Sequence, residues 1–205
     1  MLQKHIFLHI LVLWLFLKQA INIKLNVDIK NLEFIGKGTQ GKVYRIDSQK
    51  CIKVFKRNKE CSNEVETLLM AQKDVHFPKL YEFGINYIIR EYVNGIELNE
   101  YLLNEKFLTS QISKKLIELY EAMVNVGYLR KDAAIFHVLV TPSAELKLID
   151  TAKAMKKKST IPSLLISGLD DIGYKEDFFK FLKNNRPDLY FQWINYSKKK
   201  YKKMY

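Results

Sequence analysis

The chain has 205 residues, 48% of them hydrophobic, and a formal net charge of +12. This length suits one domain or two small lobes that share a core, and the apolar content excludes a disordered chain. The charge predicts an anionic partner, namely a nucleotide, a nucleic acid, an acidic protein or a lipid surface, without choosing among them. The two cysteines, Cys51 and Cys61, lack metal-binding or redox spacing. Reduced thiols of this kind favour a cytoplasmic protein.

Residues 6–17, IFLHILVLWLFL, form a hydrophobic segment of twelve residues. A membrane-spanning helix needs ~20, so three interpretations stay open: an anchor at the membrane surface, a helix packed on the domain, and an extension outside the functional fold. The basic tail, residues 196–205, either adds a contact to anionic lipid or is simply solvated. We therefore treat residues 1–30 as an N-terminal extension. We expect a cytoplasmic protein, and association with a membrane through residues 6–17 is an option.

Strands dominate the next part of the chain. Residues 32–46 alternate around a glycine turn and predict a hairpin, the turn 47–50 follows, and residues 51–56 predict a third strand. The pattern then changes to a helix that begins at Ser62 or Asn63 as its N-cap and ends at FPKL.

Two further strands, residues 79–85 and 86–93, complete an antiparallel five-stranded unit with one helix. We therefore place a first lobe at 31–93, a second lobe at 94–205, and a hinge near 91–95.

The second lobe is predicted to be mainly helical, which makes the fold class α+β. Apolar residues recur from Ile112 to Val126 at helical spacing, Thr109 or Ser110 can cap the start, and Gly127 can end the helix. Two short strands, 136–140 and 145–150, surround a turn, and a lysine-rich stretch follows. Residues 176–182 and 186–194 predict two closing helices.

The glycines of GKGTQGKV carry the first functional signal. Gly36, Gly38 and Gly41 fit the pattern G-x-G-x-x-G-x-V, in which main-chain amides can approach phosphate oxygens. A dinucleotide-binding fold would continue into a helix, whereas Val43 and its neighbours continue as a strand. The hairpin therefore excludes a dinucleotide-binding fold.

These residues resemble the protein-kinase superfamily, whose glycine-rich loop precedes a strand lysine in a V-A-I-K motif. Lys53 in CIKVF occupies the lysine position. The resemblance implies that Lys53 contacts the ATP phosphates and pairs with a helix glutamate, which is Glu64, with Glu66 as the close competitor.

The segment YIIREYVNGIEL is similar to the hinge of this superfamily. The resemblance implies that the main chain from Glu91 to Val93 meets the adenine edge. Its faces would lie between Ile35, Val43 and Leu139. Arg90 then occupies the gatekeeper position, where the superfamily usually has an apolar residue or threonine.

The segment RKDAAIFHVLV resembles the catalytic loop H-R-D-L-x-x-x-N. Asp132 takes the place of the aspartate that orients the acceptor hydroxyl and accepts its proton. His137 stands five residues later in the asparagine position, where it either binds a metal or only hydrogen-bonds within the loop. Imidazole suits softer ions such as Mn²⁺ better than Mg²⁺.

Asp150 in IDTAK resembles the metal-binding aspartate of the Asp-Phe-Gly motif, with Thr151 and Ala152 in the other two positions. Only about fifty residues follow, which resembles the reduced kinases: the RIO type, the KEOPS-complex kinase, the lipopolysaccharide-core kinases, and small serine/threonine kinases of low-GC bacteria. The last group is the nearest. The resemblance covers residues 32–154, within a two-lobed fold whose C-lobe is truncated.

The resemblance implies an ATP-dependent serine/threonine protein kinase that uses Mg²⁺ or Mn²⁺. The resemblance implies ATP and a protein substrate as partners. The hydrophobic segment and the basic tail leave an anionic membrane surface as an option, and no nucleic acid is expected because no basic helix is interleaved with aromatic residues. One alternative is a pseudokinase that binds nucleotide or partners, indicated by His137 and the altered motifs. Another is a small-molecule or sugar kinase, although Lys131 before the aspartate favours a protein acceptor. Ser159 and Thr160 are candidate autophosphorylation sites.

Overall fold

A computed structural model describes residues 28–201 of the chain, without the side chains from 196 onward. The chain divides into two compact units. The first, from residue 28 in the described part, runs to Val93 and also contains Asp150–Met155; the second contains Asn94–Ile149 and the chain from Lys156 onward. The hydrophobic segment 6–17 lies outside the described residues.

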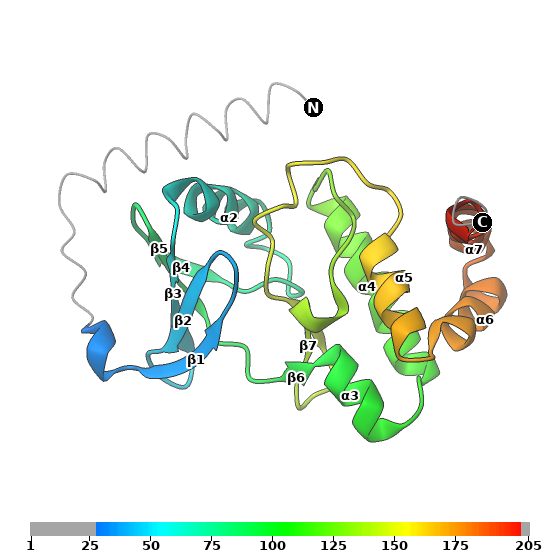
Figure 1. The fold of residues 1–205 in the computed structure, drawn as a ribbon, viewed down its shortest axis with the longest axis horizontal. Helices are drawn as coiled ribbons and strands as arrows, with labels where there is room; N and C mark the ends of the chain where they lie inside the picture. Colours follow the sequence, from blue (N-terminus) through cyan, green and yellow to red (C-terminus); the bar gives the residue numbers. More distant parts are fainter. Residues whose placement is uncertain (1–27, 202–205) are drawn as a thin grey trace. The chain divides into compact units, whose positions relative to one another are not determined.

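The first unit contains a five-stranded antiparallel sheet in the order β1-β2-β3-β5-β4 (Figure 1). A short 3-10 turn, η1 (Ile29–Asn31), precedes it. The strands are β1 (Glu33–Lys37), β2 (Gly41–Arg45), β3 (Lys50–Phe55), β4 (Leu80–Phe83) and β5 (Tyr87–Glu91). The predicted hairpin and all three later strands are confirmed. Asp47 closes the turn before β3 because its Oδ1 accepts hydrogen bonds from the main-chain N–H groups of Gln49 and Lys50.

Helix α2 (Asn58–Met70) packs against one face of this sheet. Its buried side chains Cys61, Val65 and Leu68 recur at helical spacing and contact Phe55 of β3 and Ile88 of β5 within one apolar cluster. The helix begins four residues before Ser62, so the prediction of its start was wrong. Cap preferences favoured Ser62 or Asn63, but the packing face already begins at Cys61.

The predicted end of this helix was also wrong, since α2 stops at Met70 rather than at FPKL. Asp74 organises the connection that follows. Its Oδ1 accepts hydrogen bonds from the main-chain N–H and from the ring Nδ1 of His76, and its carbonyl accepts from Phe77 N. Local side-chain bonding of this kind competes with helix continuation.

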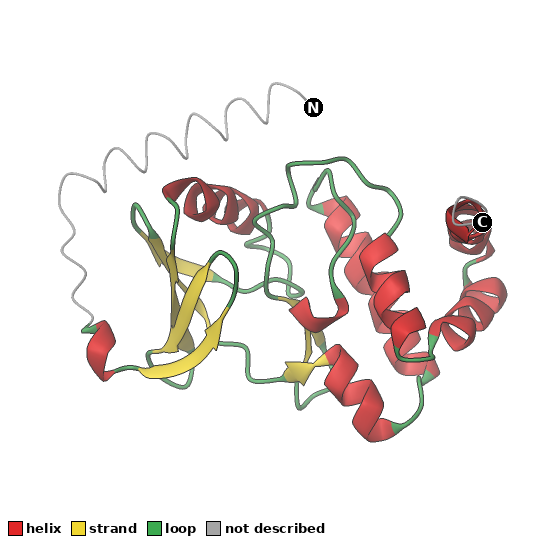
Figure 2. Ribbon diagram, viewed as in Figure 1, coloured by secondary structure: helices red, strands yellow, loops and turns green. Residues whose placement is uncertain are grey.

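The second unit is mainly helical (Figure 2). Its elements are β6 (Ile96–Glu97), α3 (Leu98–Glu105), α4 (Ser110–Asn125), η2 (Ile135–His137), β7 (Val138–Val140), β8 (Leu146–Leu148), α5 (Ser163–Asp171), α6 (Lys175–Asn185) and α7 (Pro187–Tyr201). Strands β6, β7 and β8 form a small antiparallel sheet. The described residues thus form an α+β protein with a five-stranded sheet and six α-helices.

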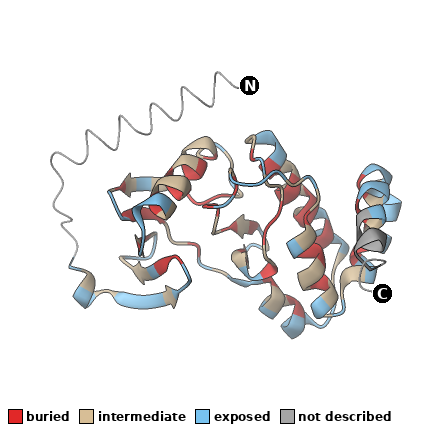
Figure 3. Ribbon diagram, turned by 45° about the horizontal axis from the view of Figure 1, so that its top comes forward, coloured by how far each residue is buried: buried red, intermediate tan, exposed pale blue. Residues whose placement is uncertain are grey.

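Helix α4 has the ends that its sequence predicts. The Thr109 hydroxyl accepts a hydrogen bond from Ile112 N, and Gly127 adopts a φ of 84° beyond the last turn. Its buried face lies among the core residues of this unit, marked red in Figure 3. Trp193 of α7 packs into this core, and the centroid of its ring lies 4.9 Å from that of Tyr120 and 6.3 Å from that of Phe178.

Two differences in the second unit bear on the site. Phe136 and His137 were predicted to lie in a strand, but they belong to the 3-10 turn η2, so β7 begins at Val138. Helix α5 was not predicted. Its buried residues Leu165, Ile166 and Leu169 have helical spacing but sit within a short window that follows a polar, lysine-rich stretch. Within residues 28–201, no helix is both long and apolar enough to span a bilayer.

Candidate active site

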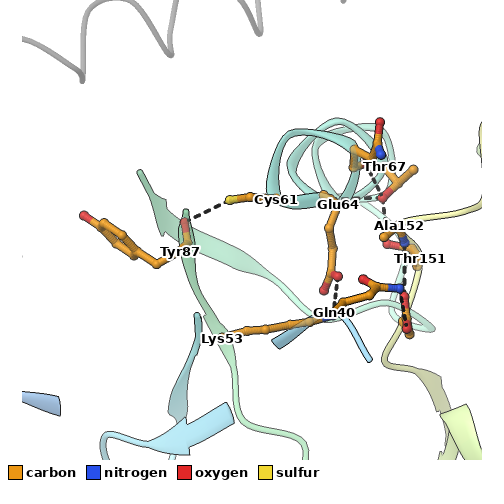
Figure 4. Close-up of polar contacts among 10 residues, drawn as sticks. Gln40, Lys53, Cys61, Glu64, Thr67, Tyr87, Thr151 and Ala152 are labelled. Atoms are coloured by element: carbon orange, nitrogen blue, oxygen red, sulfur yellow. Dashed lines mark hydrogen bonds and ion pairs between the residues drawn. The ribbon is translucent and has the colours of Figure 1, made fainter. Parts of the chain in front are cut away.

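A buried ion pair lies at the centre of the first unit. Lys53 Nζ of β3 is 2.5 Å from Glu64 Oε2 of α2, and both residues are buried. Figure 4 shows the Lys53 side chain extending from the sheet toward the carboxylate that descends from α2. The structure thus pairs Lys53 with Glu64, while Glu66, the competing candidate, lies two positions further along the helix.

Glu64 is held in an environment that opposes its charge. Burial raises the pKa of Glu64, and the positive charges of Lys53 and Arg90 counteract this in part. Its second oxygen, Oε1, has no hydrogen-bond partner among the described residues. A buried pair of this type is weak evidence for a stabilising role, because the desolvation of both ions opposes their attraction.

Asp150 belongs to the same unit and contacts the glycine-rich loop. Gln40, near the tip of the β1–β2 turn, donates from Nε2 to Asp150 Oδ2 at 3.2 Å, and Ala152 N donates to Asp150 Oδ1 at 3.3 Å. Asp150 also raises the pKa of Glu64 through its negative charge, after the larger influences of burial, Lys53 and Arg90. The structure therefore brings together three of the predicted residues: Lys53, Glu64 and Asp150.

The three loop glycines have different surroundings. A Cβ at Gly41 would lie 2.1 Å from the carbonyl oxygen of Val54, so this position requires glycine for packing of the hairpin on β3. A Cβ at Gly36 or Gly38 would meet nothing within 4 Å. Packing within the described residues therefore does not require glycine at these two positions.

A buried pair of hydroxyls fixes the chain beyond Asp150. Thr67 Oγ1 of α2 and Thr151 Oγ1 are 2.7 Å apart (Figure 4). Thr67 also contacts the main-chain carbonyls of Asn63 and Glu64. Where the resemblance predicts phenylalanine, a threonine thus ties the segment to the helix that supplies Glu64. Neither this pairing nor that of Gln40 with Asp150 was predicted, because each joins segments that are far apart in the sequence.

The predicted hinge follows β5. Tyr92 N donates to the Gln49 carbonyl, and Glu91 N donates to the Lys79 carbonyl. Val93 is buried, and within the described residues its main-chain groups make no hydrogen bond to other main-chain groups. Ile35 is partly exposed on β1, and Val43 pairs with Gly36 across the hairpin.

Arg90 is the clearest departure from the superfamily pattern. It is 5% exposed, lies opposite Cys51 in the β3–β5 register, and its Nε has no hydrogen-bond partner among the described residues. Its charge lowers the pKa of Glu64, so it acts as a second cation near the same carboxylate. The desolvation of this guanidinium is poorly compensated.

We expect Arg90→Met to raise the free energy of unfolding by ~1 kcal/mol or more, because an apolar side chain of similar length removes an incompletely bonded buried charge while Lys53 still neutralises Glu64. Urea unfolding of the variant and of Arg90→Lys, which keeps the charge, measures this. A large loss of stability in the methionine variant alone would instead make Arg90 an essential partner of Glu64.

Asp132 lies in the second unit and is held by α5. Its Oδ2 accepts a hydrogen bond from Ser163 Oγ at 3.0 Å, and its Oδ1 accepts one from Leu164 N at 2.9 Å. Arg130 Nη2 lies 3.7 Å from Asp132 Oδ2. Burial raises the pKa of Asp132, and these contacts oppose the shift. A carboxylate offers about four acceptor positions, so both oxygens keep capacity for a further donor.

The remaining predicted residues of this unit lie close by in the chain. His137 ends η2, its carbonyl accepts a hydrogen bond from Ile149 N, and its ring contacts that of Phe136 at 4.6 Å. Leu139, predicted to contact adenine, lies on β7 and pairs with Lys147. The role of Ser163 and Leu164 was missed because α5 was missed. The sequence PSLL, with serine ahead of apolar residues, was the available signal.

A lysine on a strand pairs with a glutamate on a helix, and a glycine-rich hairpin belongs to the same sheet. Together with the predicted hinge and the loop aspartate that follow, these features define a protein-kinase-like fold. Residues 36–192 match the model of the RIO domain family. The chain therefore belongs to this family, an atypical protein-kinase-like family of ATP-using phosphotransferases. No curated protein matches the chain.

The residues present fit a divalent metal bound together with phosphates. Among the described residues no three His, Cys, Asp or Glu side chains form a cluster that could hold a metal alone. Mg²⁺ is commonly bound by one or two carboxylates together with substrate phosphates. Asp150 supplies such a carboxylate, oriented by Gln40 and Ala152.

Proposed function

We propose that this chain is a serine/threonine protein kinase that transfers the γ-phosphate of ATP to a hydroxyl group. The observation that carries the proposal is the buried Lys53–Glu64 pair in the same unit as Asp150. Phosphoryl transfer needs reactants in line and neutralised charge rather than covalent chemistry by the protein. A fixed ammonium and a fixed carboxylate provide these conditions.

Each residue has a role in this proposal. Gly36 and Gly38 let the loop approach the phosphates, and Lys53 binds them. Ile35, Val43 and Leu139 would contact adenine, whose edge would meet the main chain from Glu91 to Val93. Asp150 and His137 would hold the metal, which neutralises charge on the phosphates when bound.

Asp132 would orient the acceptor hydroxyl and take its proton. The raised pKa of Asp132 supports this role, since a carboxylate with a higher pKa is a stronger base. The Ser163 hydroxyl and the first turn of α5 would keep the carboxylate in one orientation.

The test is incubation of the purified chain with γ-labelled ATP and either Mg²⁺ or Mn²⁺, read as label on the chain itself and on proteins of a cell lysate. Labelling by the parent protein that is lost in the Asp132→Asn variant supports the proposal. A pseudokinase is the second candidate, because His137 replaces the asparagine of the catalytic loop. Thermal stabilisation by ATP and metal without transfer under either ion would favour that candidate.

The metal preference gives a separate prediction. His137→Asn replaces an imidazole by a harder amide oxygen, so we expect the ratio of Mg²⁺-supported to Mn²⁺-supported transfer to rise ~10-fold. Initial rates with each ion measure this ratio. An unchanged ratio would mean that His137 only hydrogen-bonds within its loop, as its unpredicted position in the η2 turn allows.

A further inference from the structure

Five cations gather where the lysine-rich segment meets the catalytic loop. They are Arg130, Lys131, Lys156, Lys157 and Lys158, here named the basic strip, and all belong to the second unit. Lys156, Lys157 and Lys158 are exposed, and none of the three forms an ion pair within the described residues. Arg130 and Lys131 directly precede Asp132 in the chain, and the three other lysines follow it by more than twenty residues.

Main-chain hydrogen bonds hold the two parts of the strip together. Lys131 N donates to the Ser159 carbonyl at 2.8 Å, and Ser159 N donates to the Leu129 carbonyl at 3.0 Å. Arg130 and Ser159 form a parallel bridge. The Tyr120 hydroxyl also donates to the Thr160 carbonyl at 2.9 Å, which fixes the end of the lysine run to α4. These hydrogen bonds therefore fix the backbone at the end of the lysine run within the second unit.

The four lysines of the strip form no ion pair among the described residues, whereas Arg130 lies 3.7 Å from Asp132. The pKa of Lys131 is lowered by burial and by the positive charge of Lys158. Asp132 does not neutralise the lysines, because its oxygens bond to Ser163 and Leu164 and lie near Arg130. Like charges held near one another destabilise the unbound protein, and an anionic ligand relieves this repulsion.

We propose that the basic strip binds an acidic segment of the acceptor protein, beside the serine or threonine that is phosphorylated. This proposal rests on the proposed kinase function and names the class of its substrate. A polypeptide fits better than a nucleic acid, because residues 156–160 contain no aromatic side chain on which a base could stack. Acidic side chains in an extended peptide can meet consecutive exposed lysines.

The experiment compares two peptides that contain one serine flanked either by glutamates or by glutamines. The variant Lys157→Gln/Lys158→Gln removes two charges from the strip. The control Lys180→Gln/Lys183→Gln removes two exposed charges from α6 of the same unit. At low salt we expect KM for the acidic peptide to rise ~5-fold or more in the strip variant alone, with kcat unchanged, as loss of two solvent-exposed charge contacts implies.

Binding of the same peptides, labelled with a fluorophore and measured by anisotropy without ATP, separates this proposal from the kinase function. Strip-dependent binding without any phosphate transfer would support the proposed role of the basic strip in peptide binding and contradict the proposed kinase activity. Equal binding of both peptides would overturn the surface, and so would an equal effect of the control. Strip-dependent binding of an RNA oligonucleotide in preference to the acidic peptide would overturn it too.

Discussion

Replacing Asp150 by asparagine should lower phosphate transfer by ~10²-fold or more while the protein stays folded, because the amide keeps the shape of the carboxylate but loses the charge that would hold the metal. Its contacts to Gln40 and Ala152 show that the side chain already has a fixed orientation. Initial rates at saturating ATP and metal measure the effect.

Asp74→Asn is the matched control, since it removes one carboxylate from a structural turn of the same unit. We expect it to leave the rate unchanged. Thermal shifts add a second measurement: metal should no longer increase the stabilisation by ATP in the Asp150 variant. Full transfer activity in that variant would contradict the role proposed for Asp150.

The second large effect is expected for Lys53→Met, which should lower transfer by ~10²-fold or more and also destabilise the protein by ~3–5 kcal/mol. The loss of stability arises because Glu64, completely buried, is left without the ammonium that contacts it at 2.5 Å. Urea unfolding measures the stability and γ-phosphate transfer measures the rate.

The stability loss should depend on pH. Burial raises the pKa of Glu64 above its ordinary value of 4.5, and Lys53 is the largest influence that opposes this. Without Lys53 the pKa of Glu64 rises further, so the folded state binds a proton that the unfolded state does not bind at the same pH. Stability then increases as pH falls through the folded pKa toward the ordinary value.

The difference in unfolding free energy between Lys53→Met and the parent should therefore shrink on acidification. The double variant Lys53→Met/Glu64→Gln is the control, because it lacks the titrating group. It should recover part of the stability and lose this pH dependence while staying inactive. A pH-independent difference in the single variant would show that the lysine contributes by packing rather than by charge.

Local patterns were enough to predict most of the first unit. The G-x-G-x-x-G-x-V hairpin and the strand around Lys53 were confirmed because alternation and turn residues act over a few positions. The choice between Glu64 and Glu66 needed coordinates, since both lie on one helix and only the direction of the side chain separates them. The start of α2 was predicted wrongly because packing of Cys61 prevailed over cap preference.

Contacts between distant segments could not be predicted. Gln40 and Asp150 are 110 positions apart, and Thr67 and Thr151 are 84 apart, and no periodicity relates residues at such separations. Helix α5 was missed because its apolar window is short. Because this helix was missed, the contacts that hold Asp132 were missed as well. The five-residue separation of Asp132 and His137, in contrast, could be read from the sequence.

The cap that Asp132 forms on α5 links a local opening of the chain to the proposed base. Because Leu164 N donates directly to this carboxylate, fraying of the first helical turn removes one of its hydrogen bonds and loosens the other. The rate at which the Leu164 amide exchanges its hydrogen with deuterated solvent therefore reports how often the proposed base is released from its fixed orientation.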